Sequence, residues 1–371
     1  MVLDSVRVLD LSRLLPGPYC TMMLADFGAE VIKIEDPFQG DYLRNFEPKV
    51  DENSAVFHSL NQNKKSVILN LKDSADRQSF LKLVEYADVV VESFRPGVME
   101  RLGLDYETLK AVNPGIIYCA ITGYGQDGPL KDEPGHDLNY LGYAGLLQLM
   151  GDKHQKPFVP ATQIADIGGG AYPALVGILL ALMEREKTGN GQFVDISMLD
   201  GVVSWLHMML PNHIAGSEPK RGSELLNGGY ACYQVYETKD GKYLALGAVE
   251  EKFWRAFCKG IGRDEFGALQ HAPLDLQEDM IIEIETIMKQ QTQEEWLSKF
   301  DHIEACLTPV STFDEMLENP QLQERDMIQA SDLRTIGNPI KLSNSETQSP
   351  SPAPEHGEHT EEILRKLEQR Q

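Results

Sequence analysis

The first half of the chain alternates short apolar runs with helical patterns, and this alternation limits the possible folds more than any other feature. The apolar runs lie at residues 6–12, 31–35, 66–71, 88–94 and 116–125, and helical patterns such as 18–30 and 74–87 separate them. Apolar strands joined by helices predict a mostly parallel sheet covered on both faces. The sequence therefore predicts an α/β fold for this half.

The pattern changes near residue 200. Residues 230–250 alternate like a β-hairpin with Asp240-Gly241 at its turn, and helical patterns follow. The tail is polar and rich in proline, as an extended arm would be. We predict a large domain over residues 1–199, a small α+β domain over 200–325, and a C-terminal arm over 326–371 that returns to the large domain.

Charge and composition exclude several classes of function. The net charge of -23 argues against nucleic-acid binding through the overall field. Five scattered cysteines favour a reducing compartment over a disulfide framework. The N-terminus lacks a signal-peptide pattern, and the longest apolar run, 171–183, is too short for a bilayer. We predict a soluble cytoplasmic protein with neither nucleic acid nor a membrane as its partner.

Ligands of parallel sheets bind beyond the carboxyl ends of the strands, and those ends are rich in Gly and Pro here. The first strand is followed by "SRLLPGPY" in place of G-x-G-x-x-G, which argues against a nicotinamide cofactor. Several cations fall near predicted strand ends, namely Arg13, Lys33, Arg44, Lys64, Lys65 and Arg95. They are either solvated surface charges or a pocket for a phosphorylated ligand.

One histidine and one aspartate stand at glycine-marked breaks. His136 lies in "PGHDLNY", and Asp166 lies in "QIADIGGGAYPALVG". Asp166 is either a helix N-cap or a reactive carboxylate, and His136 is either a packed residue or an acid/base group. We predict no metal site, because no second His or Cys stands at ligand spacing and "HGEH" at 356–359 reads as a solvated stretch.

Several motifs together resemble one family. They occur in the order "VRVLDLSRLLPGPY", "FGAEVIKIE", "NQNKKSVILNLK", "VVVESFRPGVMERLGL", "ITGYGQDGP", "GHDLNY", "ADIGGG", "GNGQFVDISMLDG" and "ACLTPV". This order is similar to that of the family III CoA-transferases, which include carnitine CoA-transferases, formyl-CoA transferases and α-methylacyl-CoA racemases. The resemblance runs from about Val6 into the C-terminal tail.

The resemblance implies a Rossmann-like large domain, a small domain and an interlocked ring homodimer. It implies acyl-CoA substrates, with coenzyme A as part of the substrate and no tightly bound cofactor. The active site would lie between the large domain of one chain and the small domain of the other. The CoA-binding residues would then be Arg13, Lys64, Lys65, Arg95, Gly135 and Tyr140.

The resemblance also implies roles for the reactive groups. Asp166 matches the family's catalytic aspartate, a nucleophile in transferases and a proton-transfer base in racemases. "GHDLNY" and "ALGAVE" resemble the racemase branch, in which His136 is the second acid/base and Glu250 joins from the small domain. The amides of "DIGGG" are candidate donors to a thioester enolate.

The sequence thus favours a 2-methylacyl-CoA racemase-like enzyme. The alternatives are a CoA-transferase that moves CoA between carboxylic acids through Asp166, and a CoA-binding protein without catalysis. One departure from the family is Asp36, which stands where a basic residue that contacts CoA phosphates is common.

Overall fold

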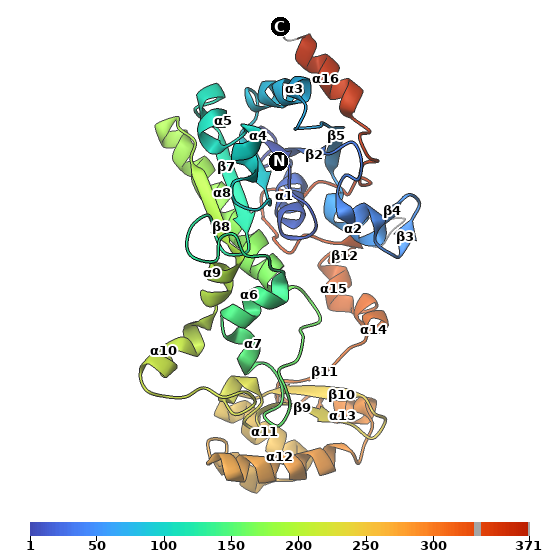
Figure 1. The fold of residues 1–371 in the computed structure, drawn as a ribbon. Helices are drawn as coiled ribbons and strands as arrows, with labels where there is room; N and C mark the ends of the chain where they lie inside the picture. Colours follow the sequence, from blue (N-terminus) through green and yellow to red (C-terminus); the bar gives the residue numbers. More distant parts are fainter. Residues whose placement is uncertain (330–334, 370–371) are drawn as a thin grey trace. The chain divides into compact units, whose positions relative to one another are not determined.

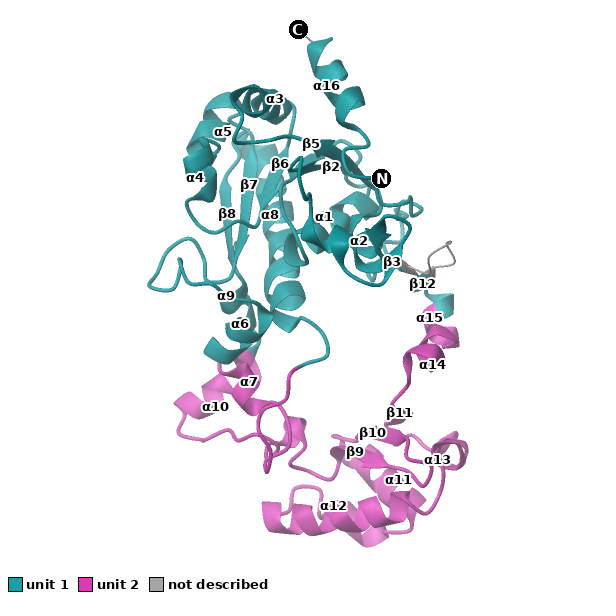
Figure 2. Ribbon diagram, turned by 45° about the vertical axis from the view of Figure 1, so that its right-hand side comes forward, with its two compact units in different colours: residues 1–144, 160–205, 323–371 teal, residues 145–159, 206–322 magenta. Residues whose placement is uncertain are grey.

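The computed structural model describes residues 1–329 and 335–369, which form two compact units (Figure 2). Unit 1 comprises residues 1–144, 160–205 and 323–371, and unit 2 comprises residues 145–159 and 206–322. The sequence places the segment 145–159 in the large domain, whereas this segment belongs to unit 2 here. This segment packs in unit 2, where Arg221 donates to the carbonyl oxygens of Asp152 and Gln148 at 3.1 and 3.2 Å.

Unit 1 is built on a six-stranded parallel sheet in the order β5-β2-β1-β6-β7-β8 (Figure 1). The strands are β1 (Arg7–Asp10), β2 (Glu30–Glu35), β5 (Lys64–Ile68), β6 (Val89–Glu92), β7 (Ile117–Thr122) and β8 (Phe193–Ser197). Val8 of β1 pairs with Val31 of β2 on one side and Val89 of β6 on the other. The strand order therefore reverses between β1 and β6, and such a switch point is where ligands bind in open α/β sheets.

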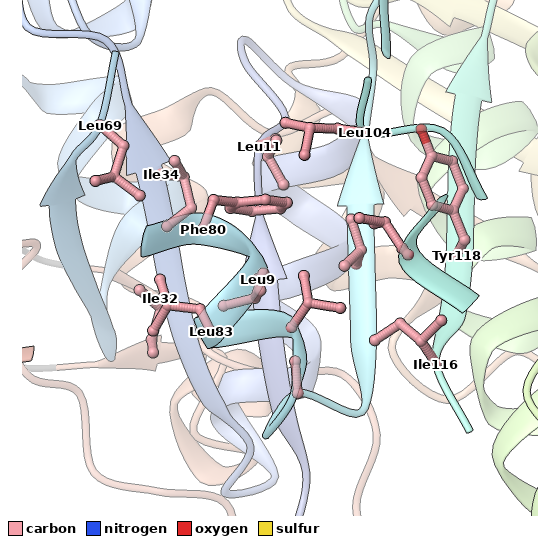
Figure 3. Close-up of a cluster of buried hydrophobic side chains, with 14 of the residues drawn as sticks. Leu9, Leu11, Ile32, Ile34, Leu69, Phe80, Leu83, Leu104, Ile116 and Tyr118 are labelled. Atoms are coloured by element: carbon pink, nitrogen blue, oxygen red, sulfur yellow. The ribbon is translucent and has the colours of Figure 1, made fainter. Parts of the chain in front are cut away.

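Helices cover both faces of this sheet. On one face, α3 (Ser74–Val84), α4 (Val98–Leu102), α5 (Tyr106–Val112) and α16 (Thr360–Glu368) pack on alternate strand residues, including Leu9, Ile32 and Tyr118 (Figure 3). On the other face, α1 (Pro16–Asp26) contacts β1, β2 and β6, and α8 (Tyr172–Thr188) contacts β7 and β8. The predicted α/β class is confirmed.

The remaining elements of unit 1 are short. They are η1 (Tyr42–Asn45), β3 (Lys49–Val50), β4 (Asn53–Ser54), α2 (Ala55–Asn61), α6 (Asp137–Tyr143), η2 (Ala165–Ala171), α9 (Met198–Val203), β12 (Ile328–Gln329) and β13 (Thr335–Ile336). The helix α15 (Pro320–Glu324) spans the division between the units.

η2 and α8 continue as one helix over Ala165–Thr188, whose 24 residues are long and apolar enough to cross a membrane. The sequence predicts a later start, near Gly170, and an apolar run too short for a bilayer. Only 44% of the helix's most apolar window is buried, although the helix packs on the sheet as a core helix does. The predictions of a cytoplasmic location and of no membrane partner stay predictions.

The C-terminal arm docks on unit 1 at the edge strand β5. His359 donates its backbone N–H to Ser66 O at 2.9 Å, and its ring Nδ1 accepts from Ser66 N at 3.3 Å. His356 Nε2 lies 2.9 Å from Asp36 O. The prediction of a solvated "HGEH" stretch is therefore wrong, because both imidazoles bond to backbone polar groups that lie far away in the sequence.

Unit 2 is an α+β body around a three-stranded sheet. Its strands are β9 (Tyr233–Glu237), β10 (Tyr243–Gly247) and β11 (Leu307–Pro309), in the antiparallel order β11-β10-β9. Its helices are α7 (Leu146–Leu149), η3 (Leu206–Met208), α10 (Leu210–Ile214), η4 (Leu225–Asn227), α11 (Glu251–Ile261), η5 (Asp264–Ala268), α12 (Leu274–Met288), α13 (Gln293–Phe300) and α14 (Phe313–Leu317). The hairpin turns at Asp240-Gly241, where Gly241 has a φ of 73°.

Candidate active site

Asp166 lies in the first turn of η2, a π-helical turn that leads into α8. Burial of its carboxyl group raises the pKa of Asp166 to about 7, and the negative charge of Asp137 adds to this shift. Such π-turns are rare and concentrate at functional sites. An aspartate that titrates near neutral pH is suited both to take and to give a proton.

The three glycines after Asp166 allow close packing of helices. A Cβ on Gly169 would lie 2.7 Å from Met198 O in α9, and one on Gly170 would lie 2.8 Å from Met198 Cγ. The contact is mutual, because a Cβ on Gly201 of α9 would lie 2.0 Å from Gly169 O. The glycines therefore hold the turn that carries Asp166 against α9.

Amides at the start of η2 are already engaged. The N–H groups of Ala165 and Asp166 donate to Asp137 Oδ1 at 2.6 and 3.0 Å, and Ile167 N donates to Gln163 O at 3.1 Å. The predicted role of the "DIGGG" amides as enolate donors is therefore wrong for Asp166 and Ile167. The sequence does not reveal this, because the acceptor Asp137 comes from another helix.

His136 stands at the N-cap of α6, where it is exposed. Its backbone N–H donates to Asn139 Oδ1 at 3.0 Å, which fixes the entry into the helix. Asp137 is the next residue, and α6 packs against η2. The two bonds that Asp137 accepts therefore tie the segment of His136 to the turn of Asp166.

Gly135 and Tyr140 lie on either side of His136 in the sequence and contact each other. Tyr140 is buried, and its hydroxyl group donates to Gly135 O at 2.6 Å. A Cβ on Gly135 or on Gly123 would lie 2.7 or 2.4 Å from the Tyr140 ring. Gly135 and Tyr140 therefore pack against each other beside the carboxyl end of β7, and their predicted CoA binding stays a prediction.

Two predicted cations lie at the switch point. Arg13 follows β1, Arg95 follows β6, and Arg13 N donates to Ser93 Oγ at 3.2 Å. Burial and the charge of Asp166 raise the pKa of Tyr140, whereas the Arg95 cation lowers it, so Arg95 lies within electrostatic reach of the same cluster. Arg95 is exposed and free of the sheet's core.

Lys64 and Lys65 belong to the edge strand β5 and do not follow either strand of the switch point. Lys64 begins β5 and is buried under α1, where it pairs with Asp10 at 3.2 Å and donates to Pro18 O, Thr21 Oγ1 and Asn61 Oδ1. Lys65 pairs with Glu30 at 2.6 Å. Both residues begin β5, and the ammonium group of Lys64 extends from there to Asp10 at the end of β1, where α1 covers it.

The prediction that these two lysines contact CoA phosphates therefore does not agree with the structure. Burial lowers the pKa of Lys64 to about 8, and the nearby Lys33 cation adds to this effect while Asp10 opposes it. A buried lysine with four partners has a structural role. Lys33 and Arg44 are also buried, paired with Asp41 at 2.8 Å and Glu35 at 2.6 Å.

Glu250 belongs to unit 2. It is the exposed N-cap residue of α11, in the short connection between β10 and α11. Its predicted part in catalysis stays a prediction. Unit 2 also has a hollow of about 440 Å³ lined by residues that include His154, Gly228, Gly229 and Glu278. We place the candidate site on unit 1 instead, because Asp166, whose pKa is raised to about 7, lies there.

The geometry of unit 1 thus brings together a carboxyl group that titrates near pH 7, an exposed imidazole on a segment tied to it, and two arginines along one sheet edge. Asp137, which sequence reasoning missed as a functional residue, makes the connection. Its position directly after His136 is the signal that was available.

The chain is similar to known proteins over nearly its whole length. The model of CoA-transferase family III matches residues 3–360. The chain is 34% identical to alpha-methylacyl-CoA racemase of Homo sapiens over 370 residues, covering 98% of this chain and 93% of that protein. It is 30% identical to succinyl-CoA:glutarate CoA-transferase of Mus musculus, covering 98% and 86%.

Solved structures show the same fold. A CAIB/BAIF family protein from Brucella suis matches with a TM-score of 0.88 and 30% identity, covering 98% of both chains. A hypothetical protein from Mycobacterium tuberculosis matches with a TM-score of 0.81 and 29% identity, covering 97% of this chain and 98% of that chain. Since the family model spans nearly the whole sequence and the fold agrees, this chain belongs to CoA-transferase family III.

Proposed function

We propose that this protein is a 2-methylacyl-CoA racemase-like enzyme, which inverts the carbon next to the thioester carbonyl. The observation that carries the proposal is the pair of bonds from the Asp166 turn to Asp137, at 2.6 and 3.0 Å, which ties His136 to a carboxyl group with a pKa of about 7. Similarity to racemases at 34% and 37% identity supports the same activity.

The chemistry needs one base and one acid on opposite faces of the α-carbon. For one enantiomer, ionised Asp166 takes the α-proton, and the C–H electron pair moves into the thioester to form an enolate. Protonated His136 then gives a proton to the other face. For the opposite enantiomer, neutral His136 takes the proton and protonated Asp166 returns one. No atom is gained or lost, and the two groups exchange protonation states.

The CoA part of the substrate follows the carboxyl edge of the sheet in this proposal. With the thioester at Asp166, beside β7 and β8, we place the nucleotide end near β6, β1 and β2, because the exposed Arg95 and the partly exposed Arg13 follow β6 and β1. Arg95 and Arg13 are the cations on that path. Glu250 stays a predicted participant from unit 2.

The second candidate is CoA transfer, which the similarity to succinyl-CoA:glutarate CoA-transferase supports. There Asp166 attacks the thioester as a nucleophile, and no second acid/base is needed. His136 is the discriminating residue between the two reactions.

Incubation of the purified enzyme with a single enantiomer of a 2-methylacyl-CoA in heavy water tests the proposal. We expect loss of optical purity with deuterium at the α-carbon and no requirement for an acid acceptor. CoA transfer to an added carboxylic acid, without deuterium incorporation, would establish the transferase instead. A protein that binds CoA and does neither would be a binding protein.

We further propose that two chains form an interlocked ring homodimer. The chain passes from unit 1 into unit 2 and ends in unit 1 again, which is the connectivity that an interlocked arrangement requires. The outer face of α8 exposes Val176, Leu180 and Met183 by 54%, 60% and 62%, an apolar stripe at helical spacing that favours a partner surface.

Interlocked folded chains cannot separate without unfolding. We therefore expect a dimer at every concentration at which the protein is folded, measured by light scattering and by mass photometry down to nanomolar concentration. Replacement of Leu180 and Met183 by serine should weaken folding rather than release a folded monomer. A folded monomer that reassociates reversibly would contradict the interlocked arrangement.

A further inference from the structure

The switch point carries an ion pair that occupies a place suited to a ligand phosphate. Arg13 Nη2 lies 2.9 Å from Asp36 Oδ2, and the two side chains are 26% and 29% exposed. The Arg13 guanidinium also donates to the Tyr42 hydroxyl group at 3.0 Å and lies over the rings of Tyr42 and Phe94. One of the two arginines at the switch point thus already has an anionic partner.

The segment that carries Arg13 is held rigidly. Leu14 has a φ of 62°, an unfavourable backbone conformation for a leucine. Leu14 N donates to Asp41 Oδ1 at 3.1 Å, and Ser12 O accepts from buried Lys33 Nζ at 2.9 Å. Buried groups therefore fix the backbone on both sides of Arg13, and the contacts to Asp36 and Tyr42 hold its guanidinium group.

Asp36 is fixed as well. Its Oδ1 accepts from the N–H groups of Phe38 and Gln39, both at 2.9 Å, which leaves Oδ2 for Arg13. Slight burial raises the pKa of Asp36, but the Gln39 and Phe38 amides and the Arg13 cation outweigh this effect and lower it. The carboxylate therefore stays ionised at neutral pH.

A phosphate that reaches Arg13 must share the guanidinium N–H groups with the Asp36 carboxylate or displace that carboxylate. If both anions bind to the same guanidinium group, the phosphate and the carboxylate repel each other. We infer that Asp36 is a built-in competitor for phosphate at Arg13, so that the protein selects little for the 3′-phosphate of CoA and accepts dephospho-CoA thioesters nearly as well. This inference rests on the proposed function, which puts the adenosine end of CoA near β1 and β2.

The variant Asp36→Asn isolates this effect. The amide Oδ1 can still accept from Phe38 and Gln39, while the Nδ2 group that replaces Oδ2 cannot accept from Arg13. The loop should keep its conformation while Arg13 loses its anionic partner. Glu107→Gln, an exposed glutamate on α5, removes the same charge elsewhere in unit 1 and serves as the matched control.

The experiment is calorimetric titration of wild type, Asp36→Asn and Glu107→Gln with CoA and with dephospho-CoA. We expect Asp36→Asn to tighten CoA binding about tenfold, within the range for bonds to charged groups, and to leave dephospho-CoA unchanged. The ratio of the two affinities should therefore rise at least threefold in Asp36→Asn and stay constant in Glu107→Gln. Melting curves check that both variants fold.

A smaller rise in that ratio would overturn the inference while leaving the proposed function intact. In the double variant Arg13→Gln, Asp36→Asn the gain should disappear, which assigns it to Arg13. Failure of the wild-type protein to bind either ligand would instead contradict the proposed function itself, and the inference with it.

Discussion

Asp137 accepts two backbone hydrogen bonds from the turn that carries Asp166, and its negative charge lies beside the Asp166 carboxyl group. Neighbouring like charges disfavour a second ionisation, as burial also does. The same side chain therefore holds the Asp166 turn in position and adds to the effect of burial, which raises the pKa of Asp166 to about 7. This single residue couples the geometry of the site to its pH dependence.

The Asp137→Asn variant separates these two effects. Its amide oxygen still accepts the N–H groups of Ala165 and Asp166, but the charge is gone. The pKa of Asp166 should fall, and the acid limb of kcat/KM should move to lower pH for the enantiomer that needs ionised Asp166. The shift is partial, because burial is the larger cause.

The measurement is the pH profile of kcat/KM for each enantiomer separately. Asp132→Asn, an exposed aspartate in the loop before His136, is the control and should keep the wild-type profile. An acid limb at the same pH in Asp137→Asn and wild type would show that Asp137 does not set the titration of Asp166.

Asp166 should also lower the stability of the folded protein above neutral pH. Its pKa is raised from 3.8 to about 7, so its proton is bound more tightly in the folded state. This contribution favours folding below pH 3.8 and is lost as the pH rises through about 7. At pH 8, Asp166→Asn should therefore unfold with a higher free energy, by on the order of 4 kcal/mol, because one pKa unit corresponds to about 1.4 kcal/mol.

Urea denaturation of wild type and Asp166→Asn at pH 8 and at pH 4 measures this difference. The gain should shrink toward pH 4. The structure does not support the alternative role as a helix N-cap, because Ile164 is the N-cap residue of η2 and Asp166 lies inside its first turn. An Asp166→Asn variant that is less stable than wild type at pH 8 would contradict the raised pKa of Asp166.

At the scale of elements, the position of Asp166 depends on the contact between η2 and α9. Gly169 and Gly201 meet there with no room for a side chain, since a Cβ on Gly201 would lie 2.0 Å from Gly169 O. The close contact is between backbones, which cannot yield as a flexible side chain would. A change in α9 should thus displace the turn that carries the reactive carboxyl group.

Gly201→Ala tests this dependence. We expect a loss of about 1–3 kcal/mol in unfolding free energy, the range for overpacking, and a fall in kcat. Gly142→Ala in α6 is the control, because a Cβ there meets nothing within 4 Å. That variant should be as stable as wild type or gain roughly 0.5–1 kcal/mol. Wild-type kcat in Gly201→Ala would mean that α9 does not position Asp166.

At the scale of the whole molecule, local pattern was sufficient to predict much of the architecture. The runs at 31–35 and 116–125 became β2 and β7, and Asp240-Gly241 became the turn of the β9–β10 hairpin. These features depend on neighbours in the sequence. The order of strands and the switch point depend on tertiary pairing, which local pattern does not reveal.

The site was predictable only in part for the same reason. Glycine-marked breaks revealed His136 and Asp166, but the burial of Lys64 depends on Asp10, which lies 54 residues earlier. The packing of segment 145–159 in unit 2 involves Arg221, which lies about 70 residues later in the sequence. Charge alone cannot distinguish a buried lysine with four partners from a phosphate ligand.

The central claim is that His136 and Asp166 transfer protons on opposite faces of the α-carbon, and one experiment tests it most directly. His136→Ala and Asp166→Ala are each incubated with the separate (2R) and (2S) 2-methylacyl-CoA thioesters in heavy water, and deuterium at the α-carbon is followed by mass spectrometry. We predict that both variants lose racemisation, and that each retains exchange with one enantiomer only, opposite for the two variants. Full racemisation by His136→Ala, or trapping of an Asp166 adduct by hydroxylamine, would contradict the claim and establish CoA transfer through Asp166.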